Sequence, residues 1–336
     1  MDKYNLLDCT LRDGGYITNW NFGNSMIRDT INTLVDANFD FVEVGYLNNK
    51  PYVSETVQFQ TIEQIADYLP KDKKNSSILA MADVKQFNPK DLTPFTGKSI
   101  DGIRVVFYKH QVEEALNLSK TIKEMGYKLF VQPMVTIDYS VDEYSKLSKQ
   151  IANLDPYSVS IVDSFGYMIK SDFRQYFKIL DNSLPEKCMI GFHSHNNMNL
   201  SFITAQDILE YHTSRRLVID SSLYGMGRGA GNLQTELIAN YYNMTLGDKY
   251  DMIKIIDLIG KYIMPIQKEN SWGYSPYFFL TGLYKCHPNY VTYLLQEYEV
   301  GVSEFKEFLD TIPKDMYTTC RKPFVLEKYR EFLGTK

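Results

Sequence analysis

Cysteine is scarce in this sequence of 336 residues, which contains four widely separated cysteines. None of them forms a CxxC pair, so the spacing indicates neither a zinc ribbon nor a disulfide framework. No apolar run reaches the length that a membrane-spanning helix requires. The first residues show no basic segment followed by an apolar one, and we therefore expect no signal peptide and a reduced, cytoplasmic protein.

Neither sign of charge dominates the composition. The formal net charge is −5, which gives no basic surface for nucleic acid, and we expect neither a nucleic-acid nor a membrane partner. Hydrophobic residues make up 44% and charged residues 23% of the chain, as in globular proteins that bury a large core. The length fits one α/β barrel with a smaller appendage.

Short β-rich segments alternate with helical patterns over most of the sequence. Such alternation is typical of βα units that build a parallel sheet. Eight β-rich segments occur, which is the number that closes a TIM barrel. We expect strands at residues 4–9, 41–44, 77–81, 102–107, 128–135, 158–162, 189–193 and 217–221.

The segments between these strands have helical periodicity. Residues 25–38 place Met26, Ile31 and Leu34 on one face, and a second helix over 111–125 stops at Gly126. An open doubly wound sheet is the alternative, but the turn after the first strand lacks a GxGxxG fingerprint. We therefore expect an α/β protein with a (β/α)₈ TIM barrel.

The alternation stops near Gly247. We assign residues 1–247 to the barrel and residues 248–336 to a helical C-terminal region. In that region Pro265 and residues 270–276 indicate a hinge or loop. Helices are expected at residues 251–263, 288–298, 303–309 and 327–332.

Polar residues stand at the ends of the first and seventh predicted strands. Arg12 and Asp13 follow the first strand, where barrels of this type place their active sites. His193 and His195 are two residues apart on the seventh strand and so point to the same side. Two imidazoles and a carboxylate suit a divalent metal. The alternatives to a metal site are that Arg12 and Asp13 form a surface ion pair near a turn and that the two histidines are an HxH pair by chance.

The segment after the eighth strand is rich in glycine. Four glycines in residues 225–231 allow the backbone to approach a ligand closely and to adopt positive φ. A cradle for a phosphate or carboxylate is one interpretation, and a flexible turn is the other. Its place after the eighth strand favours the cradle.

Together these segments resemble the metal-dependent barrel lyases that include 4-hydroxy-2-oxovalerate aldolase, hydroxymethylglutaryl-CoA lyase and isopropylmalate synthase. The resemblance covers residues 4 to about 245. The C-terminal part is most similar to the aldolase branch, which has a Gly-Tyr pair followed by an aromatic helix, here Gly273 and Tyr274. The matching motifs are Asp-x-Thr-Leu-Arg-Asp-Gly at residues 8–14, His-x-His at 193–195 and Gly-x-Gly-x-x-Ala-Gly-Asn at 225–232, with smaller matches at 42–45 and 162–164.

The resemblance implies a site and a cofactor. It implies one Mn²⁺ or Mg²⁺ per chain and makes Arg12 the electrophilic residue beside the metal. The implied metal ligands are Asp13, His193, His195 and Asn232, and the implied substrate-binding residues are Ser164, Gly227 and Gly229.

One departure from the family pattern concerns the general base. The aldolases have a histidine just after the Asp-Gly turn and the synthases have a glutamine, whereas this sequence has Tyr16 there. An ordinary tyrosine, with a pKa of about 10, is a poor base at neutral pH. Nearby positive charge favours the phenolate, so Tyr16 and Tyr274 are the candidate catalytic tyrosines.

The resemblance further implies a metal-dependent aldolase that cleaves or forms a C–C bond of a 4-hydroxy-2-oxoacid, with a pyruvate enolate and an aldehyde as its parts. The alternatives are an acyl-CoA-dependent Claisen-type synthase or hydroxymethylglutaryl-CoA-lyase-like enzyme, and a non-catalytic metal-binding descendant. An Fe(II) oxygenase shares the ligand set, but the eight βα units argue against it. The expected partners are a small 2-oxoacid or aldehyde, an aldehyde dehydrogenase that takes the product, and further copies of the chain.

Overall fold

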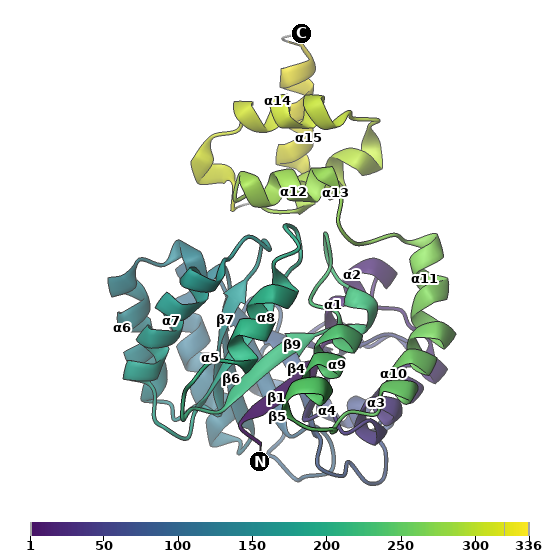
Figure 1. Ribbon diagram of the computed structural model, residues 1–336, viewed down its shortest axis with the longest axis vertical. Coiled ribbons are helices and arrows are strands. Elements are labelled where there is room, and N and C mark those ends of the chain that lie inside the picture. The colour runs from purple at the N-terminus through teal and green to yellow at the C-terminus, as the bar shows by residue number, and fades with distance from the viewer. Residues whose placement is uncertain (1, 319, 335–336) are drawn as a thin grey trace.

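Eight parallel strands close into a barrel in the computed structural model, which describes residues 2–318 and 320–334 (Figure 1). The strand order is β1-β9-β8-β7-β6-β5-β4-β2, and pairing of β1 with β2 closes the ring. A two-residue strand, β3 (Gln58–Phe59), extends β2 outside the barrel. The predicted TIM barrel is confirmed. Its strands are β1 (Tyr4–Asp8), β2 (Phe41–Leu47), β4 (Ser77–Asp83), β5 (Gly102–Phe107), β6 (Lys128–Pro133), β7 (Ser158–Asp163), β8 (Met189–Ser194) and β9 (Leu217–Ser221).

Amphipathic helices surround the barrel (Figure 1). In the first long one, Ile27, Ile31 and Leu34 are fully buried against the strands, as the spacing of these residues predicts. The helices are α3 (Asn24–Asp36), α4 (Ile62–Ala66), α5 (Val112–Glu124), α6 (Val141–Ala152), α7 (Lys170–Ser183), α8 (Ser201–Leu209) and α9 (Thr235–Leu246), and two short turns, α1 (Thr10–Asp13) and α2 (Gly15–Thr18), follow β1.

The inside of the barrel is built in layers along the strands. Near the N-terminal ends of the strands, an apolar cluster that includes Phe41 and Phe130 fills the interior. Because side chains two residues apart share a face, the next inward positions are Glu43, Arg104 and Asp220, all at most 1% exposed. A layer of charged side chains therefore lies directly above the apolar layer, on the side of the C-terminal strand ends, where barrels place active sites.

A β-bulge in β2 changes which side chains enter the barrel. The register with β4 shifts between Glu43 and Tyr46, and Gly45 has φ +142°, a conformation open mainly to glycine. The extra residue re-aims the strand, so that Tyr46 as well as Glu43 faces the barrel mouth.

The chain after α9 first packs on the barrel. Helix α10 (Met252–Leu258), a π-helical turn (Ile259–Ile263) and α11 (Met264–Glu269) form one continuous helical segment, and its apolar residues join the barrel core. The expected hinge at Pro265 is therefore wrong. Proline removes one backbone donor and crowds the preceding turn, and the wide π-helical turn just before it accommodates the ring. The loop expected over residues 270–276 is present between Glu269 and Pro276.

Four further helices lie over the barrel mouth with a core of their own (Figure 1). Their cluster includes Tyr290, Phe308 and Val325, each at most 2% exposed. The predicted helical C-terminal region is thus present, and we propose that its independent part begins after Glu269 rather than at residue 248. The helices are α12 (Pro276–Leu283), α13 (Asn289–Glu297), α14 (Val302–Thr311) and α15 (Lys322–Gly334). In the part of the chain that the structure describes, no helix has the length and apolar character needed to cross a membrane.

Replacing Gly45 tests the role of the bulge. A Cβ added there would lie 2.1 Å from the Val57 carbonyl oxygen, and positive φ adds strain. We expect Gly45→Ala to lower the free energy of unfolding by about 1–3 kcal/mol, measured by denaturant titration. Gly260→Ala is the control, because a Cβ there meets no atom within 4 Å. Equal stability of the two variants would contradict this role.

Candidate metal centre

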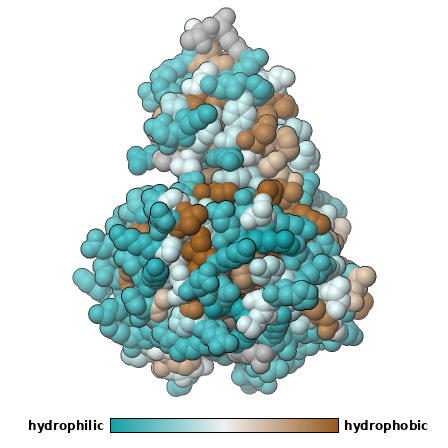
Figure 2. Space-filling model, turned by 60° about the vertical axis from the view of Figure 1, so that its left-hand side comes forward, coloured by the Kyte–Doolittle hydropathy of each residue, from teal (hydrophilic) through white to brown (hydrophobic). Residues whose placement is uncertain are grey.

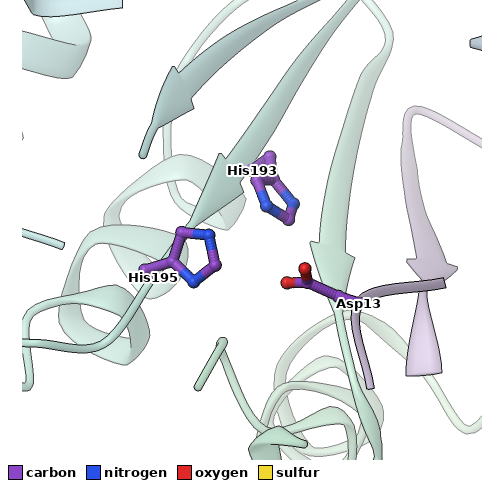
Figure 3. Close-up of side chains that lie close together, drawn as sticks. All are labelled: Asp13, His193 and His195. Carbon is purple, nitrogen blue, oxygen red and sulfur yellow. The ribbon is translucent and has the colours of Figure 1, made fainter. Parts of the chain in front are cut away.

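Asp13, His193 and His195 converge at the C-terminal end of the barrel (Figure 3). The short turn α1 after β1 carries Asp13, and β8 and the residue after it carry the two histidines. One potential ligand atom from each lies within 4.8 Å of the other two, and all three residues are buried. The geometry therefore brings together the three residues that the sequence analysis named as metal ligands.

Each imidazole is held through its Nδ1 atom. The Nδ1 of His193 lies 3.1 Å from Asp220 Oδ2, and the Nδ1 of His195 lies 3.3 Å from the carbonyl oxygen of Gly231. An acceptor at Nδ1 fixes the proton there and leaves Nε2 with a free lone pair. A carboxylate or carbonyl behind a histidine is the usual support for a metal-binding imidazole.

Several buried oxygen atoms at and beneath this site have no hydrogen-bond partner among the described residues, and two of them lie beside the three converging side chains. Asp13 Oδ1 accepts a hydrogen bond of 2.8 Å from Arg12, but Asp13 Oδ2 and Asn232 Oδ1 are both buried without a donor. Buried acceptors without partners are costly, and a cation is the partner that both would share. The residues present therefore fit a divalent metal ion.

The protonation states also suit a cation. Burial would raise the pKa of Asp13, but the charges of Arg12 and the neighbouring histidines hold it well below its usual range. Burial lowers the pKa of His195 to about 3, an effect that Asp13 only partly opposes. At neutral pH the site thus offers an ionised carboxylate and a neutral imidazole, the forms that bind metals.

A chain of buried ion pairs runs beneath the site and connects two of its residues. Arg12 donates to Asp13 and, through Nε, to Glu43 Oε2 at 2.9 Å. Arg104 donates to the same Glu43 oxygen at 2.8 Å and also to Asp220 Oδ2. We call Asp13, Arg12, Glu43, Arg104, Asp220 and His193, in this order, the ion chain.

The ion chain carries an excess of negative charge. It contains three carboxylates and two guanidinium groups, and all five side chains are at most 6% exposed. An uncompensated buried charge is strongly unfavourable. Arg228 also acts on Asp13, and a divalent cation beside Asp13 would offset the surplus carboxylate, which is a second reason why a metal fits.

We call Asp13, His193 and His195 the triad. A small cavity of about 40 Å³ lies above it. The cavity has room for small groups only. Arg12 and Asp13 form part of its wall, and Arg12 Nη2 makes no hydrogen bond to the described residues. The remaining lining residues are Tyr16, Tyr46, Met81, Val106, Gln132, Met134, Val162, Ser164, His193, His195 and Arg228.

The structure places the predicted substrate-binding residues in different surroundings. Ser164 lines the small cavity and accepts a hydrogen bond of 2.9 Å from the Val135 amide. Gly227 lies against the triad, since a Cβ there would be 3.1 Å from Asp13 Oδ2. Gly229 faces away from the triad toward Pro288 of the C-terminal region.

The two candidate catalytic tyrosines also differ in position. Tyr16 lines the small cavity, is 39% exposed, and has its hydroxyl 3.3 Å from that of Tyr46. Tyr274 lies in the loop between α11 and α12, is 55% exposed, and does not line the small cavity. The structure therefore brings Tyr16, but not Tyr274, to the triad.

Several residues at the site were missed in the sequence. Arg104 and Asp220 lie inside strands that otherwise consist of buried residues, and a charge at an inward position was the available signal. Arg228 lies inside the glycine loop and lines the small cavity. His287 comes from the helical C-terminal region, and nothing in its sequence surroundings indicates that it reaches the barrel.

Comparison with known proteins gives the family. The HMGL-like family model matches residues 3–259, and the chain belongs to this family. The relatives include 4-hydroxy-2-oxovalerate aldolases from Rhodococcus jostii, 22% identical over 79% of this chain and 75% of the relative, and from Thermomicrobium roseum, 26% identical over 77% and 72%. An oxaloacetate decarboxylase from Mycobacterium tuberculosis is 23% identical over 69% and 68%.

Solved structures agree with this assignment. The N-terminal domain of a candidate aldolase from Bacteroides vulgatus superposes with a TM-score of 0.75 at 28% identity, covering 87% of this chain and 98% of that one. The HMG-CoA lyase from Brucella melitensis gives 0.63 at 13% identity, over 80% and 100%. The second similarity is one of fold alone. The family match and the relatives named as aldolases make the chain a carbon–carbon lyase.

Removing either histidine tests the metal centre. We expect His193→Ala and His195→Ala to lose most of the bound Mn²⁺, because each removes one of three protein ligands. Metal content per chain after loading and desalting measures this. His212→Ala, on an exposed histidine, should keep the wild-type content. Undiminished metal in both triad variants would rule the site out.

Proposed function

We propose that this protein is a divalent-metal-dependent aldolase that cleaves or forms the C3–C4 bond of a 4-hydroxy-2-oxoacid. The observation that most supports this proposal is the buried triad, which lies beside Arg12 in a cavity at the barrel mouth. Within the triad, Asp13 Oδ2 has no hydrogen-bond partner among the described residues. Membership of a family whose relatives are named as aldolases of such acids supports the substrate class.

The metal ion proposed is Mn²⁺ or Mg²⁺, held by Asp13, His193 and His195 with Asn232 Oδ1 nearby. It would act as a Lewis acid on the 2-oxo group. When the C3–C4 bond breaks, its electron pair moves onto C3 and is delocalised to the C2 oxygen. The products are the enolate of pyruvate, which is then protonated at C3, and an aldehyde.

Arg12 is placed to stabilise the charge that develops on the C2 oxygen. Glu43 and Asp13 fix its guanidinium through Nε and Nη1, so that Nη2 remains for a substrate oxygen. A donor that is already oriented costs no reorganisation during the reaction. Burial opposes the charge of Arg12, but Asp13 and Glu43 together raise its pKa well above the usual value, so the group stays a cation.

Tyr16 is our candidate for moving the proton of the C4 hydroxyl. Its hydroxyl is paired with that of Tyr46, and the guanidinium of Arg228 lies over its ring at 5.5 Å. Burial raises the pKa of Tyr46 well above its ordinary value, so Tyr46 remains a neutral phenol that can donate to the Tyr16 oxygen. That arrangement and the adjacent cation favour an acceptor role for Tyr16.

An activity assay tests the function and separates it from its alternatives. The Mn²⁺-loaded protein is incubated with 4-hydroxy-2-oxoacids, and pyruvate and aldehyde are measured. Release of free thiol from acetyl-CoA plus a 2-oxoacid would instead identify a Claisen-type synthase. No turnover of any of these substrates would identify a non-catalytic metal-binding protein. A partner dehydrogenase and a homo-oligomer stay predictions.

Substitution of Arg12 tests the role of its guanidinium. We expect Arg12→Ala to lose at least about a hundredfold in turnover, the scale for one preorganised oxyanion donor, while metal content is retained. Arg12→Lys should also be poor because a point charge does not reproduce the planar fork. Wild-type turnover in Arg12→Ala would make Arg12 a structural residue only.

A phenylalanine at position 16 tests the proton acceptor. Tyr16→Phe keeps the ring beneath Arg228 but removes the hydroxyl, so we expect kcat to fall more than KM rises. Steady-state kinetics of C–C cleavage give both values. An unchanged kcat with a shifted KM would assign Tyr16 to substrate binding and leave another group as the acceptor.

A further inference from the structure

A second, much larger cavity lies between the barrel mouth and the C-terminal region. Its volume is about 680 Å³. Figure 2 shows the surface narrowing where the two parts meet, with hydrophobic side chains gathered along the junction. The cavity wall combines barrel loops with the C-terminal region and consists of Tyr108, Lys109, His110, Met134, Val135, Asp138, His287, Thr318, Cys320 and Arg321.

The large cavity adjoins the small one at the triad. Met134 lines both cavities. Arg228 of the small cavity and His287 of the large one are in contact, with Nη1 and Nε2 3.5 Å apart. A substrate whose reacting head lay in the small cavity would reach the large cavity past these two residues.

His287 is fixed at this junction by the C-terminal region and the barrel together. Its amide donates to the Tyr317 carbonyl at 2.8 Å, and its ring packs against Phe165 with centroids 5.5 Å apart. The next residue, Pro288, lies against Gly229, where an added Cβ would be 3.0 Å away. As a result His287 is only 5% exposed.

The hydrogen bonds of His287 determine which ring nitrogen carries the proton. The Asn289 amide donates to Nδ1 at 3.1 Å, so Nδ1 is an acceptor and a neutral ring is protonated at Nε2. Burial, reinforced by Arg228, lowers the pKa of His287 well below its usual value. The ring is therefore neutral and points an Nε2–H group toward Arg228.

Two donors thus meet without an acceptor between them. Arg228 makes no direct ion pair with a carboxylate of residues 2–318 and 320–334, although Asp13 favours its charge from a longer distance, and its buried Nε has no partner. Guanidinium nitrogens cannot accept a hydrogen bond from the Nε2–H of His287. A buried cation that lacks a direct ion-pair partner is unfavourable, and an anion bound beside the two groups would accept hydrogen bonds from both.

Two basic residues and one acidic residue also line the large cavity. The basic residues are Lys109, which is paired with Glu143 at 2.7 Å, and Arg321, and the acidic residue is Asp138. Burial raises the pKa of Asp138, and the charge of Lys109 opposes this shift. The donors that would select an anion are therefore Arg228 and His287 at the junction of the two cavities.

We propose that Arg228 and His287 bind a carboxylate on the distal part of the substrate, so that the protein acts on 4-hydroxy-2-oxoacids with an acidic tail. A guanidinium and one N–H donor match the two oxygens of a carboxylate. This inference rests on the proposed function for the head of the substrate. The acidic tail then occupies the large cavity while the reacting carbons lie at the triad.

A matched pair of unreactive 2-oxoacids tests the tail site by binding alone. 2-Oxoadipate and 2-oxohexanoate have the same chain length and differ in ending with a carboxylate or a methyl group. We expect the Mn²⁺-loaded full-length protein to bind 2-oxoadipate at least about tenfold more tightly, the scale of a charge-assisted hydrogen bond. Titration calorimetry measures both dissociation constants.

Variants assign that preference to Arg228. Arg228→Gln should bind the two acids with similar affinity, and Arg228→Lys should recover part of the preference. Arg330→Gln, which removes an exposed arginine of α15, should behave as wild type. Circular dichroism and metal content identify a variant that fails to fold. If Arg228→Gln does not fold, the affinities of Arg228→Lys and of the wild-type protein for the two acids still test the site.

The outcomes separate this inference from the proposed function. Preference for the diacid that depends on Arg228, without any C–C cleavage, would support the carboxylate site and refute the aldolase. Cleavage of neutral-tailed substrates without preference for the diacid would support the aldolase and overturn the carboxylate site. Binding of neither acid, or a preference that survives Arg228→Gln, would also overturn it.

Discussion

The ion chain from Asp13 to His193 is the constraint on which the rest of this site depends. Its charges are enclosed by the barrel, above an apolar layer that includes Phe41 and Phe130. Removing one partner of a buried pair leaves the other uncompensated, at a cost of about 3–5 kcal/mol. The chain therefore locks Arg12 and His193 in position, and its excess negative charge makes a cation above it favourable. The ion chain thus determines both the position of the candidate metal ligands and the charge around them.

The C-terminal region adds residues and a second cavity to the site at the barrel mouth. The barrel supplies the triad, Arg12 and a cavity for the head of a substrate. The helices over its mouth add His287 and enclose the second cavity, held in place by contacts such as Asn197 to Thr281 at 2.9 Å. In our proposal the barrel carries the reaction, while the C-terminal helices contribute to the space beyond the reacting carbons.

Most of the fold could be predicted because its signals are local. All eight barrel strands follow from alternating β-rich and helical segments, whereas the extension of β2 to Leu47 was missed because it needs the Gly45 bulge. The hinge predicted at Pro265 was wrong because the π-helical turn before this residue depends on packing against the barrel. Asp13, His193 and His195 stand in motifs at strand ends, so their meeting follows from barrel geometry. Arg228 and His287 come together only through docking of the C-terminal region, which no local pattern encodes.

The central claim is that the triad holds one catalytic divalent ion with Arg12 beside it. The most direct measurement is a crystal structure of the Mn²⁺-loaded protein soaked with oxalate, with anomalous data at the manganese edge. The account predicts one anomalous peak within bonding distance of Asp13 Oδ2 and the Nε2 atoms of His193 and His195, and oxalate between that peak and Arg12. A peak elsewhere, or none at this site, would contradict it.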